Sequence, residues 1–371
     1  MKIGIDAILL EREMTGIGRY LRNVLDCLLE IDRKNEYFLF SLGQLPNKYK
    51  NKGFKIISFK KNISYSKFLK FYSPFWLVFV LPFLLKRNPI DIFWQPNHFL
   101  PPFFTSKNIK FIITIHDTVL KIDRNYRGIG FGTYLDLLLP KSIKKSKKII
   151  TISQNSKKDI INFYKVPENR IKVIYSGIEE KFQPRDLENK QKENLRKKYN
   201  LPKEFILYIS GIEKRKNIQA IFKIADRLNE IKFVLFGKLG FKGKEILEKI
   251  KKRNNVNYYG FVDEDDLPYI YNLAKIFIFP SLYEGFGFPP LEAMACGIPV
   301  ITSNVSSLPE IVEEGGLMHE PNDIESFVRD ISKLLEDKDF YKKMREKAIK
   351  QATKFSWKKA TEELIEEFNK L

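Results

Sequence analysis

Short apolar runs alternate with amphipathic or polar stretches along almost the whole chain. Runs of four to six residues rich in Ile, Leu, Val, Phe and Tyr have the length of strands, and residues 18–29 place apolar side chains at helical spacing. Such alternation is typical of βαβ units and predicts parallel sheets covered by helices. The expected strands are 2–5, 37–40, 90–94, 111–115 and 148–151 in the first half, and 205–210, 232–236, 256–259, 276–279 and 299–302 in the second.

The two series of five expected strands predict two similar α/β domains separated by a polar segment. Residues 179–201 contain Pro184 and a stretch rich in lysine and glutamate, and we interpret them as a linker that ends in a lead-in helix. This assigns residues 1–178 to a first domain and residues 202–356 to a second. In doubly wound sheets ligands bind beyond the carboxyl ends of the strands, so the loops after the strands are the candidate sites.

The loop and helix in residues 283–299 form the most informative stretch. Gly285 and Gly287 allow the backbone to pass close to a ligand, because glycine has no side chain. Pro289 and Pro290 mark the first turn of a helix, where proline is tolerated. The unpaired N–H groups and positive dipole end of that turn suit a phosphate or an array of hydroxyls. The stretch therefore predicts a ligand-binding loop.

Two carboxylates flank this loop. Glu284 precedes the two glycines and Glu292 lies in the first turn of the expected helix, so both are expected to face one pocket. Each also has a simpler interpretation, Glu284 as a solvated strand-end charge and Glu292 as a charge that complements the helix dipole. Taken with Gly-Phe-Gly-Phe-Pro-Pro and Glu-Ala-Met-Ala-Cys-Gly-Ile-Pro-Val, the stretch closely resembles the donor-site signature of the retaining glycosyltransferases of family 4, which have the GT-B fold.

Further segments match this family in the order and at roughly the intervals that it shows, so the resemblance covers essentially the whole chain. They are residues 15–20, 114–117, 151–153, 213–217 and 356–357. The resemblance implies two Rossmann-like doubly wound domains facing across a cleft, with a C-terminal helix from about 357 to 371 that packs back on the first, acceptor-binding domain. It also implies a nucleotide diphosphate sugar as donor, retention of anomeric configuration, and neither a metal nor another cofactor.

The family places an Arg and a Lys against the two phosphates of the donor, in the loop after the first strand of the second domain. The matching residues are Arg215 and Lys216, and Lys216 is the favoured group for stabilising negative charge on the leaving diphosphate. A solvated run of surface charges is the alternative. The chain departs from many members in having Gly211-Ile212 where they carry Gly-Arg.

The segment 15–20 opens a helix after the first strand and superficially suggests a dinucleotide-binding loop. The third glycine position is Leu21, so the motif is incomplete and a tight turn is the alternative. In the family this loop lies beside the donor diphosphate, Glu284 binds hydroxyls of the transferred sugar and Glu292 binds the ribose hydroxyls. The donor-side residues carried over from the family are Gly16, Gly18, Arg19, Ser210, Arg215, Lys216, Asn217, Gly285, Phe286, Gly287 and Glu292.

Histidine is scarce, with three residues in the chain. His116 and Asp117 end an expected strand, and in the family this histidine lies near the transferred sugar and the acceptor; a hydrogen-bonded structural role is the general alternative. His98 follows another strand and, with Asp117, is assigned to the acceptor side. We interpret His319 as structural. The expected catalytic residues are therefore His116, Glu284 and Lys216.

The acidic run Asp263 to Asp266 contains the D-x-D pattern of some divalent-metal sites. It precedes an amphipathic segment that begins at Leu267, and acidic residues at a helix start ordinarily cap it. We therefore expect capping here and no metal.

Positive charge is concentrated in the first domain. Residues 1–178 contain 31 basic and 13 acidic side chains, a net charge of +18, out of +20 for the whole chain. Residues 71–85 are aromatic and apolar with basic flanks, and are too short to span a bilayer as a helix. They predict an interfacial segment on an anionic membrane, with Trp76 and Phe79 entering the headgroup boundary. A core helix with solvated lysines is the alternative.

Two cysteines and a strand pattern that starts at the N-terminus predict a cytoplasmic protein without disulfides or a signal peptide. We expect a hexose, with mannose from GDP-mannose favoured, to be transferred to a carbohydrate acceptor that is lipid-linked, in surface polysaccharide or glycolipid synthesis. UDP-sugars and dTDP-rhamnose remain alternative donors. The rival hypothesis is a non-catalytic basic module on a GT-B scaffold that binds membrane or nucleic acid; no nucleic-acid motif accompanies the charge, so no nucleic-acid partner is expected.

Overall fold

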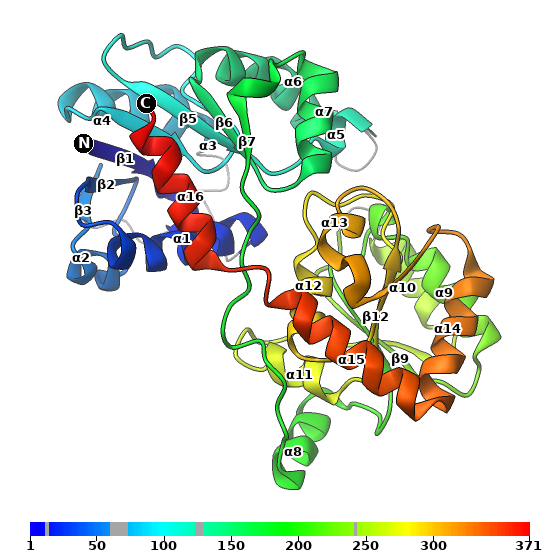
Figure 1. Ribbon diagram of the computed structural model, residues 1–371. Helices are drawn as coiled ribbons and strands as arrows, with labels where there is room; N and C mark the ends of the chain where they lie inside the picture. The colour runs from blue at the N-terminus through cyan, green and yellow to red at the C-terminus, as the bar shows by residue number, and fades with distance from the viewer. Residues whose placement is uncertain (12–14, 60–72, 123–128, 241–242) are drawn as a thin grey trace. The chain divides into compact units, whose positions relative to one another are not determined.

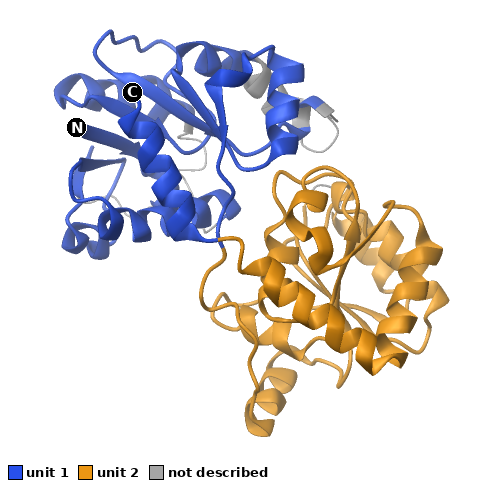
Figure 2. Cartoon of the chain, in the orientation of Figure 1, with its two compact units in different colours: residues 1–121, 129–177, 356–371 blue, residues 122–128, 178–355 orange. Residues whose placement is uncertain are grey.

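The computed structural model describes residues 1–11, 15–59, 73–122, 129–240 and 243–371. The chain divides into two compact units (Figure 2). Residues 1–121, 129–177 and 356–371 form the first unit, and residues 178–355 form most of the second. Each unit contains one parallel sheet with helices around it, so the predicted α/β class with two Rossmann-like units is confirmed.

The first unit is built on a sheet of seven strands: β1 (Lys2–Asp6), β2 (Glu36–Ser41), β3 (Lys55–Ser58), β4 (Ile92–Gln95), β5 (Lys110–Ile115), β6 (Lys148–Thr151) and β7 (Ile171–Val173). Their spatial order is β3-β2-β1-β4-β5-β6-β7, and all neighbours are parallel (Figure 1). The central strands β1, β4 and β5 are buried almost throughout, as is typical of strands covered on both faces.

The sequence pattern does not predict β3 and β7. Both lie at the edges of the sheet, β3 has no buried residue and β7 is only three residues long. An edge strand is covered less completely, so it does not need the continuous apolar run that marks a central strand.

The helical elements of the first unit are η1 (Ile8–Glu11), α1 (Gly16–Ile31), α2 (Asn47–Lys52), α3 (Ser73–Phe75), η3 (Trp76–Val80), α4 (Leu81–Arg87), α5 (Val119–Ile122), α6 (Ile129–Lys145), α7 (Gln154–Tyr164), η5 (Glu168–Arg170) and α16 (Trp357–Asn369). The Thr15 hydroxyl caps α1 by accepting from the Gly18 N–H at 3.2 Å. The apolar stripe of α1, which includes Tyr20 and Leu25, is buried.

Helix α16 belongs to the first unit, although it is the last element of the chain (Figure 1). It packs along α1, with the Trp357 ring edge-on to Tyr20 at 5.7 Å between centroids. The Glu367 carboxylate, 3% exposed, pairs with Lys148 of β6 at 3.2 Å. These contacts fix both ends of the helix on the first unit.

Gly177 lies where the chain leaves β7 and touches the start of α16. A Cβ atom at this position would lie 2.0 Å from the Trp357 backbone nitrogen, so the backbone would have to move. We expect Gly177→Ala to lower the free energy of unfolding by roughly 3 kcal/mol, the scale of overpacking in a core. Denaturant titration measures this loss. Gly16→Ala is the matched control, because a Cβ there meets no described atom within 4 Å; equal stability of the two variants would refute the proposed clash.

The second unit is built on a sheet of six strands: β8 (Ile206–Ile209), β9 (Phe233–Phe236), β10 (Val256–Tyr258), β11 (Ile276–Phe279), β12 (Val300–Ser303) and β13 (Leu317–His319). Their order is β10-β9-β8-β11-β12-β13, again all parallel. The four-residue strands β9, β11 and β12 are wholly buried, which explains why their apolar runs are so clear in the sequence. The three-residue edge strand β13 is not predicted.

The helical elements of the second unit are α8 (Asn189–Tyr199), η6 (Lys214–Lys216), α9 (Ile218–Arg227), α10 (Gly243–Ile250), α11 (Leu267–Leu273), α12 (Phe288–Ala295), α13 (Leu308–Val312), η7 (Glu313–Gly315), α14 (Ile324–Glu336) and α15 (Lys338–Ala352). Residues 179–201, interpreted above as a linker with a helix, belong to this unit. Phe182 is buried with its ring edge-on to Tyr271, which explains why this polar segment packs on the unit.

The expectation that Asp263 and Asp266 cap the following helix is wrong. Asp266 precedes α11 but its side chain makes no capping hydrogen bond. Both carboxylates instead accept from Lys198 Nζ of α8 at 2.6 Å, and the Tyr199 hydroxyl donates to Asp266 at 2.7 Å. The two carboxylates therefore link α8 to the segment before α11. They pair with a lysine that is distant in sequence and do not cap the helix that follows them.

The apolar segment 71–85 has both buried and exposed side chains in its described part. Its described part begins at Ser73 and runs through α3, the π-helical segment η3 and α4. Trp76 is buried, and its indole N–H donates to the Asp6 carboxylate at 3.0 Å. The expectation of membrane insertion is therefore wrong for Trp76, which belongs to the core. Among the described residues, no helix is both long and apolar enough to cross a bilayer.

Candidate functional site

Two loops of the second unit meet at the carboxyl edge of its sheet. Because β8 and β11 are parallel neighbours, residues 210–217 and 280–287 leave the sheet from the same edge. The Leu282 N–H donates to the Arg215 carbonyl at 2.9 Å and joins the two loops. This strand order brings together groups that lie 68 positions apart in the chain.

Glu284 is the centre of a charged cluster formed by these loops. Its Oε1 accepts from Lys216 Nζ and from Ser281 Oγ, each at 2.6 Å, and its Oε2 accepts from Arg215 at 3.2 Å. Lys216 and Glu284 are 6% and 7% exposed, so the ion pair is largely removed from water. Three of the predicted site residues, Arg215, Lys216 and Glu284, are thus in direct contact.

The Arg215 guanidinium is fixed on more than one side. It donates to the Glu213 carboxylate at 2.9 Å and to the Tyr283 carbonyl at 2.6 Å, in addition to Glu284. Two cations therefore stand side by side at the sheet edge, balanced by two carboxylates. The two cations are the groups of this cluster that could bind an anion, and each is already paired with a carboxylate.

The Glu284 carboxyl is ionised in this setting. Burial by itself would raise its pKa, but the charges of Lys216 and Arg215 and the hydrogen bonds from Lys216 and Ser281 outweigh burial. The pKa of Glu284 therefore lies below the ordinary glutamate value.

A third loop, directly after β12, clamps the backbone that carries Glu284. The Ser306 hydroxyl accepts from the Glu284 N–H at 2.8 Å, and the Ser307 hydroxyl is within hydrogen-bond distance of the carbonyls of Glu284 and Phe286, at 3.0 and 2.6 Å. Sequence reasoning missed Ser281, Ser306 and Ser307. The available signal was the Ser-rich run at 303–307, which follows a strand next to β11 in the sheet.

The glycine loop reaches α12 through a conformation that favours glycine. Gly287 has φ of 124° and immediately precedes the helix. Phe286 is 3% exposed and packs on Phe288 and Phe355, so its side chain belongs to the core. Any role of Phe286 toward a donor is therefore restricted to its backbone. For Gly285 the donor-side role stays a prediction.

Glu292 is hydrogen-bonded to a neighbouring helix of the same unit. Because α12 begins at Phe288, Glu292 is in the second helical turn, and the expectation of a first-turn position is wrong. Its side chain is 2% exposed, and its Oε2 accepts from the Tyr271 hydroxyl of α11 at 2.9 Å. The structure pairs Glu292 with Tyr271; a contact with ribose stays a prediction.

Ser210 and Asn217 sit at the two ends of the loop after β8. The Ser210 N–H donates to the Phe236 carbonyl at 3.1 Å. Asn217 adopts the left-handed region with φ of 54°, and its side-chain amide donates to the Pro321 carbonyl at 3.0 Å. Both residues thus shape the loop that presents Arg215 and Lys216.

In the first unit, His98 and His116 come together at the carboxyl edge of the sheet. They follow the parallel neighbours β4 and β5, and the His116 N–H donates to His98 Nε2 at 3.1 Å. His98 has φ of 55°, an uncommon conformation for a residue other than glycine. His98, predicted for the acceptor side, and His116, predicted as catalytic, are therefore neighbours.

The surroundings of His116 define its proton position. Its Nε2 lies 2.8 Å from the Pro96 carbonyl, which can only accept, so Nε2 carries the proton and Nδ1 holds a lone pair. Burial lowers the pKa of His116, so the ring is neutral near pH 7. His116 can thus accept a hydrogen bond through Nδ1 but cannot supply a positive charge.

The remaining predicted residues of the first unit lie near this edge. Helix α1 starts directly after the capping Thr15. Gly16 and Gly18 are in its first turn, and Arg19 follows Gly18. A Cβ at Gly16 would meet no described atom within 4 Å, so packing does not require glycine there. Asp117 accepts from the Val119 N–H at 3.3 Å and shapes the turn after β5.

Comparisons with known proteins identify the family of this chain. Residues 14–182 match the family model described as Glycosyltransferase Family 4, and residues 191–354 match Glycosyl transferases group 1. O-antigen chain mannosyltransferase B of Escherichia coli is 31% identical over 76% of this chain and 74% of its own length. The serotype-specific mannosyltransferase WbdA of Escherichia coli is 33% identical over 71% of this chain, which spans only 34% of that protein.

Solved structures share the fold at lower identity. Sucrose-phosphate synthase from Thermosynechococcus elongatus has a TM-score of 0.77 and 18% identity over 100% of this chain and 98% of its own. Anabaena HepE in complex with UDP and glucose has a TM-score of 0.73 and 16% identity over 100% of both chains. With its two Rossmann-like units, the chain has the GT-B fold and belongs to the group 1 glycosyl transferases of glycosyltransferase family 4.

Proposed function

We propose that this protein is a retaining hexosyltransferase that moves mannose from GDP-mannose to a lipid-linked carbohydrate in the synthesis of a surface polysaccharide. The observation that carries the transfer reaction is the buried cluster of Arg215, Lys216 and Glu284 at the carboxyl edge of the second sheet. Mannose is favoured because the relatives of 31% and 33% identity are named as mannosyltransferases. The O-antigen named for one of them supports a polysaccharide acceptor.

In the proposed reaction, the bond from the anomeric carbon to the diphosphate breaks and a bond to the acceptor oxygen forms on the same face of the sugar. The acceptor hydroxyl passes its proton to the departing diphosphate oxygen. Lys216 and Arg215 bind the diphosphate and stabilise the negative charge that builds on it as it leaves. Glu284, displaced from the two cations, holds hydroxyls of the transferred sugar. His116 accepts from a hydroxyl through Nδ1. In this proposal, no metal or cofactor takes part.

A panel of nucleotide sugars tests the donor. A ligand that binds only the folded state stabilises it, by about 2.7 kcal/mol at a concentration of 100 times Kd. We expect GDP-mannose to raise the melting temperature more than UDP-glucose, UDP-galactose or dTDP-rhamnose, and to be consumed when an acceptor is added. A larger shift with a UDP-sugar or dTDP-rhamnose would exclude GDP-mannose as the donor.

EDTA should leave the rate of sugar transfer unchanged. Loss of the rate with EDTA and its restoration by magnesium would contradict the metal-free reaction.

An exposed aromatic face supports a membrane partner for the first unit. Phe75, Phe79 and Phe83 follow one another at four-residue spacing along α3, η3 and α4, and are 40%, 63% and 41% exposed. The Arg87 guanidinium lies 4.2 Å from the centre of the Phe83 ring. Aromatic rings beside cations suit the headgroup boundary of an anionic leaflet, where each basic residue contributes about 1 kcal/mol. This partner implies a peripheral location on the inner face of the plasma membrane.

Replacement of Phe75, Phe79 and Phe83 by serine should therefore weaken binding to anionic vesicles at least tenfold, because the apolar area that enters the interface is lost. Sedimentation with vesicles of increasing phosphatidylglycerol content measures the effect. Phe163→Ser is the matched control, since Phe163 is 41% exposed on α7. Binding by the triple variant equal to wild type would remove this face from the proposal. Tight, salt-sensitive binding to DNA or RNA without sugar transfer would favour the basic binding module instead.

A further inference from the structure

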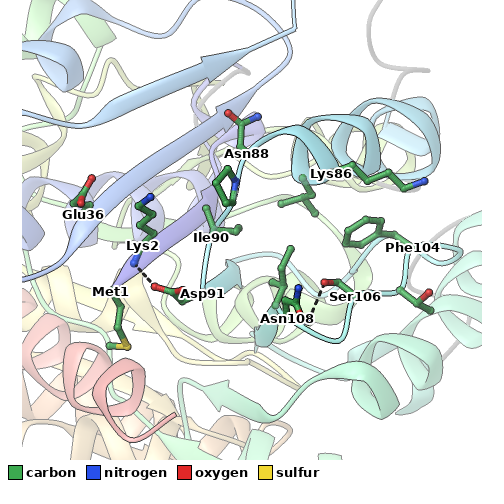
Figure 3. A pocket seen from close by; sticks show the side chains of 14 residues that line it. Met1, Lys2, Glu36, Lys86, Asn88, Ile90, Asp91, Phe104, Ser106 and Asn108 are labelled. Carbon is green, nitrogen blue, oxygen red and sulfur yellow. Dashed lines mark hydrogen bonds between the residues drawn. The ribbon is translucent and has the colours of Figure 1, made fainter.

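A cavity of about 700 Å³ lies in the first unit, apart from the residues of the candidate site (Figure 3). Its walls come from the start of β1 at Met1 and Lys2, the start of β2 at Glu36, residues within 85–91 at the end of α4 and before β4, and residues within 104–109 before β5. The volume falls within the range of about 300–1,000 Å³ that is typical of small-ligand sites.

The walls of this cavity are held by hydrogen bonds within the unit. The Lys2 N–H donates to the Asp91 carboxylate at 2.7 Å, and the Asp91 N–H donates back to the Lys2 carbonyl at 2.8 Å. On the other side, Lys145 Nζ donates to three carbonyls within residues 101–104, at 2.6 to 2.9 Å. An ammonium that uses its three donors on one loop fixes that loop, so the cavity is formed before any ligand arrives.

The lining chemistry restricts the class of ligand. The carboxylates of Glu36 and Asp91 would repel an anion such as a nucleotide or phosphate. The ammonium groups of Lys2 and Lys86 would repel a bare cation. Phe104 is 6% exposed and offers little ring surface to a planar apolar ligand. Apolar side chains form part of the lining, at Met1, Leu85, Pro89, Ile90 and Ile109. Amide and hydroxyl groups line the rest, and they belong to Asn88, Thr105, Ser106 and Asn108.

A neutral polyhydroxylated ligand matches this mixture of donors and acceptors. Each sugar hydroxyl can both donate and accept, so it can be satisfied by amides, carboxylates and ammonium groups in turn. We infer that this cavity is a second saccharide-binding site, which holds sugar units of a carbohydrate chain away from the reacting end. Binding of a saccharide at this cavity goes beyond the transfer reaction, whereas the identity of the sugar and the effect on long acceptors rest on the proposed function.

The cavity and the histidine pair lie at opposite edges of the first sheet. Asn108 precedes β5 and His116 follows it, and six strand residues at about 3.3 Å each separate the two edges by roughly 20 Å. A short acceptor bound beside His116 cannot reach the cavity, whereas a chain of several sugars can. The site is therefore expected to affect long acceptors and not short ones.

Titration of the full chain with α-linked mannotetraose, followed by calorimetry, tests the inference. Asn108→Ala should weaken binding at the cavity about five- to tenfold, the scale of one lost hydrogen bond, and Ser106→Trp should abolish binding at the cavity by filling it. Asn162→Ala, at an exposed position on α7, is the matched control and should bind as wild type does. His116→Ala should retain this binding. Transfer to a disaccharide acceptor should be unchanged in Asn108→Ala.

Three outcomes would overturn the second site. They are absence of tetrasaccharide binding by the wild type, wild-type affinity in both Asn108→Ala and Ser106→Trp, and binding of inorganic phosphate that depends on Asn108. Circular dichroism shows whether Ser106→Trp is folded, and Asn108→Ala decides if it is not. The wild-type protein could bind the tetrasaccharide, lose affinity on Asn108→Ala, and yet transfer no sugar. That result would uphold this site and refute the proposed reaction, so failure of the site and failure of the reaction are distinguishable.

Discussion

Lys216→Ala should reduce the rate of sugar transfer by about 100- to 1,000-fold, the usual effect of removing one fixed stabiliser of transition-state charge. The Lys216 ammonium lies 2.6 Å from Glu284 and is 6% exposed, so water cannot replace it well. Single-turnover rates at saturating donor measure the chemical step directly. Lys214→Ala is the matched control, because Lys214 is exposed in the same helical turn. Rates of the Lys216 variant within threefold of wild type would remove this residue from catalysis.

The buried ion pair makes stability part of this test. Removal of one partner of a buried pair costs roughly 3–5 kcal/mol, and Arg215 beside Glu284 should reduce that cost. We expect Lys216→Ala to unfold at lower denaturant than wild type. The double variant Lys216→Met with Glu284→Gln leaves no unpaired charge and should recover part of the stability without recovering the rate. Recovery of both would mean that Lys216 acts only on folding.

Glu284→Gln should lower kcat by at least tenfold and leave donor affinity less affected. The carboxylate accepts from Lys216, Ser281 and Arg215, and hydrogen bonds to a charged group contribute roughly 1.5–3 kcal/mol. A glutamine keeps the shape but presents an N–H₂ group to a cation. Steady-state kinetics with the donor varied separate kcat from KM. Wild-type values for both constants would contradict the assignment of Glu284 to the transferred sugar.

The same variant has a signature in acid. The folded pKa of Glu284 lies below its unfolded value of about 4.5, so its carboxylate stabilises the fold above that pH and the contribution is lost as pH falls through the folded pKa. The difference in free energy of unfolding between wild type and Glu284→Gln should be constant from pH 7 to pH 5. It should shrink below about pH 4.5. A difference that does not change in acid would show that the Glu284 carboxylate is not held by the cations.

Local sequence patterns were sufficient for the central strands and for the loops that follow them. Strands such as β5 and β11 are buried and apolar along their length, which makes them recognisable without knowledge of their neighbours. Short edge strands such as β7 lack that signal. Among site residues, Arg215, Lys216 and Glu284 could be identified because each follows a recognisable strand, and residues 283–299 carry a family signature.

Contacts between distant segments could not be read from any one of them. Ser306 and Ser307 can bind the backbone at Glu284 only because β12 lies beside β11 in the sheet. Asp263 and Asp266 can pair with α8 only because Lys198 lies next to them in the folded unit. Trp76 is an aromatic residue in an apolar segment with basic flanks, which is typical of a membrane-facing position. Its indole N–H nevertheless donates to Asp6 in the core. Local pattern cannot choose between the two faces of an apolar helix when both are aromatic.

The sequence by itself determined that this protein has two parallel α/β units, that its candidate binding loops follow the strands, and that two basic residues and a glutamate belong to two separate loop motifs of one family. These properties are local, since periodicity, turn residues and short motifs act over a few neighbouring positions. Only the tertiary structure decided that Glu284 is paired with Lys216, that Glu292 is paired with Tyr271, and that a polar cavity opens at the amino edge of the first sheet. The physical reason is that strand order sets which loops meet, and strand order is a property of the whole unit.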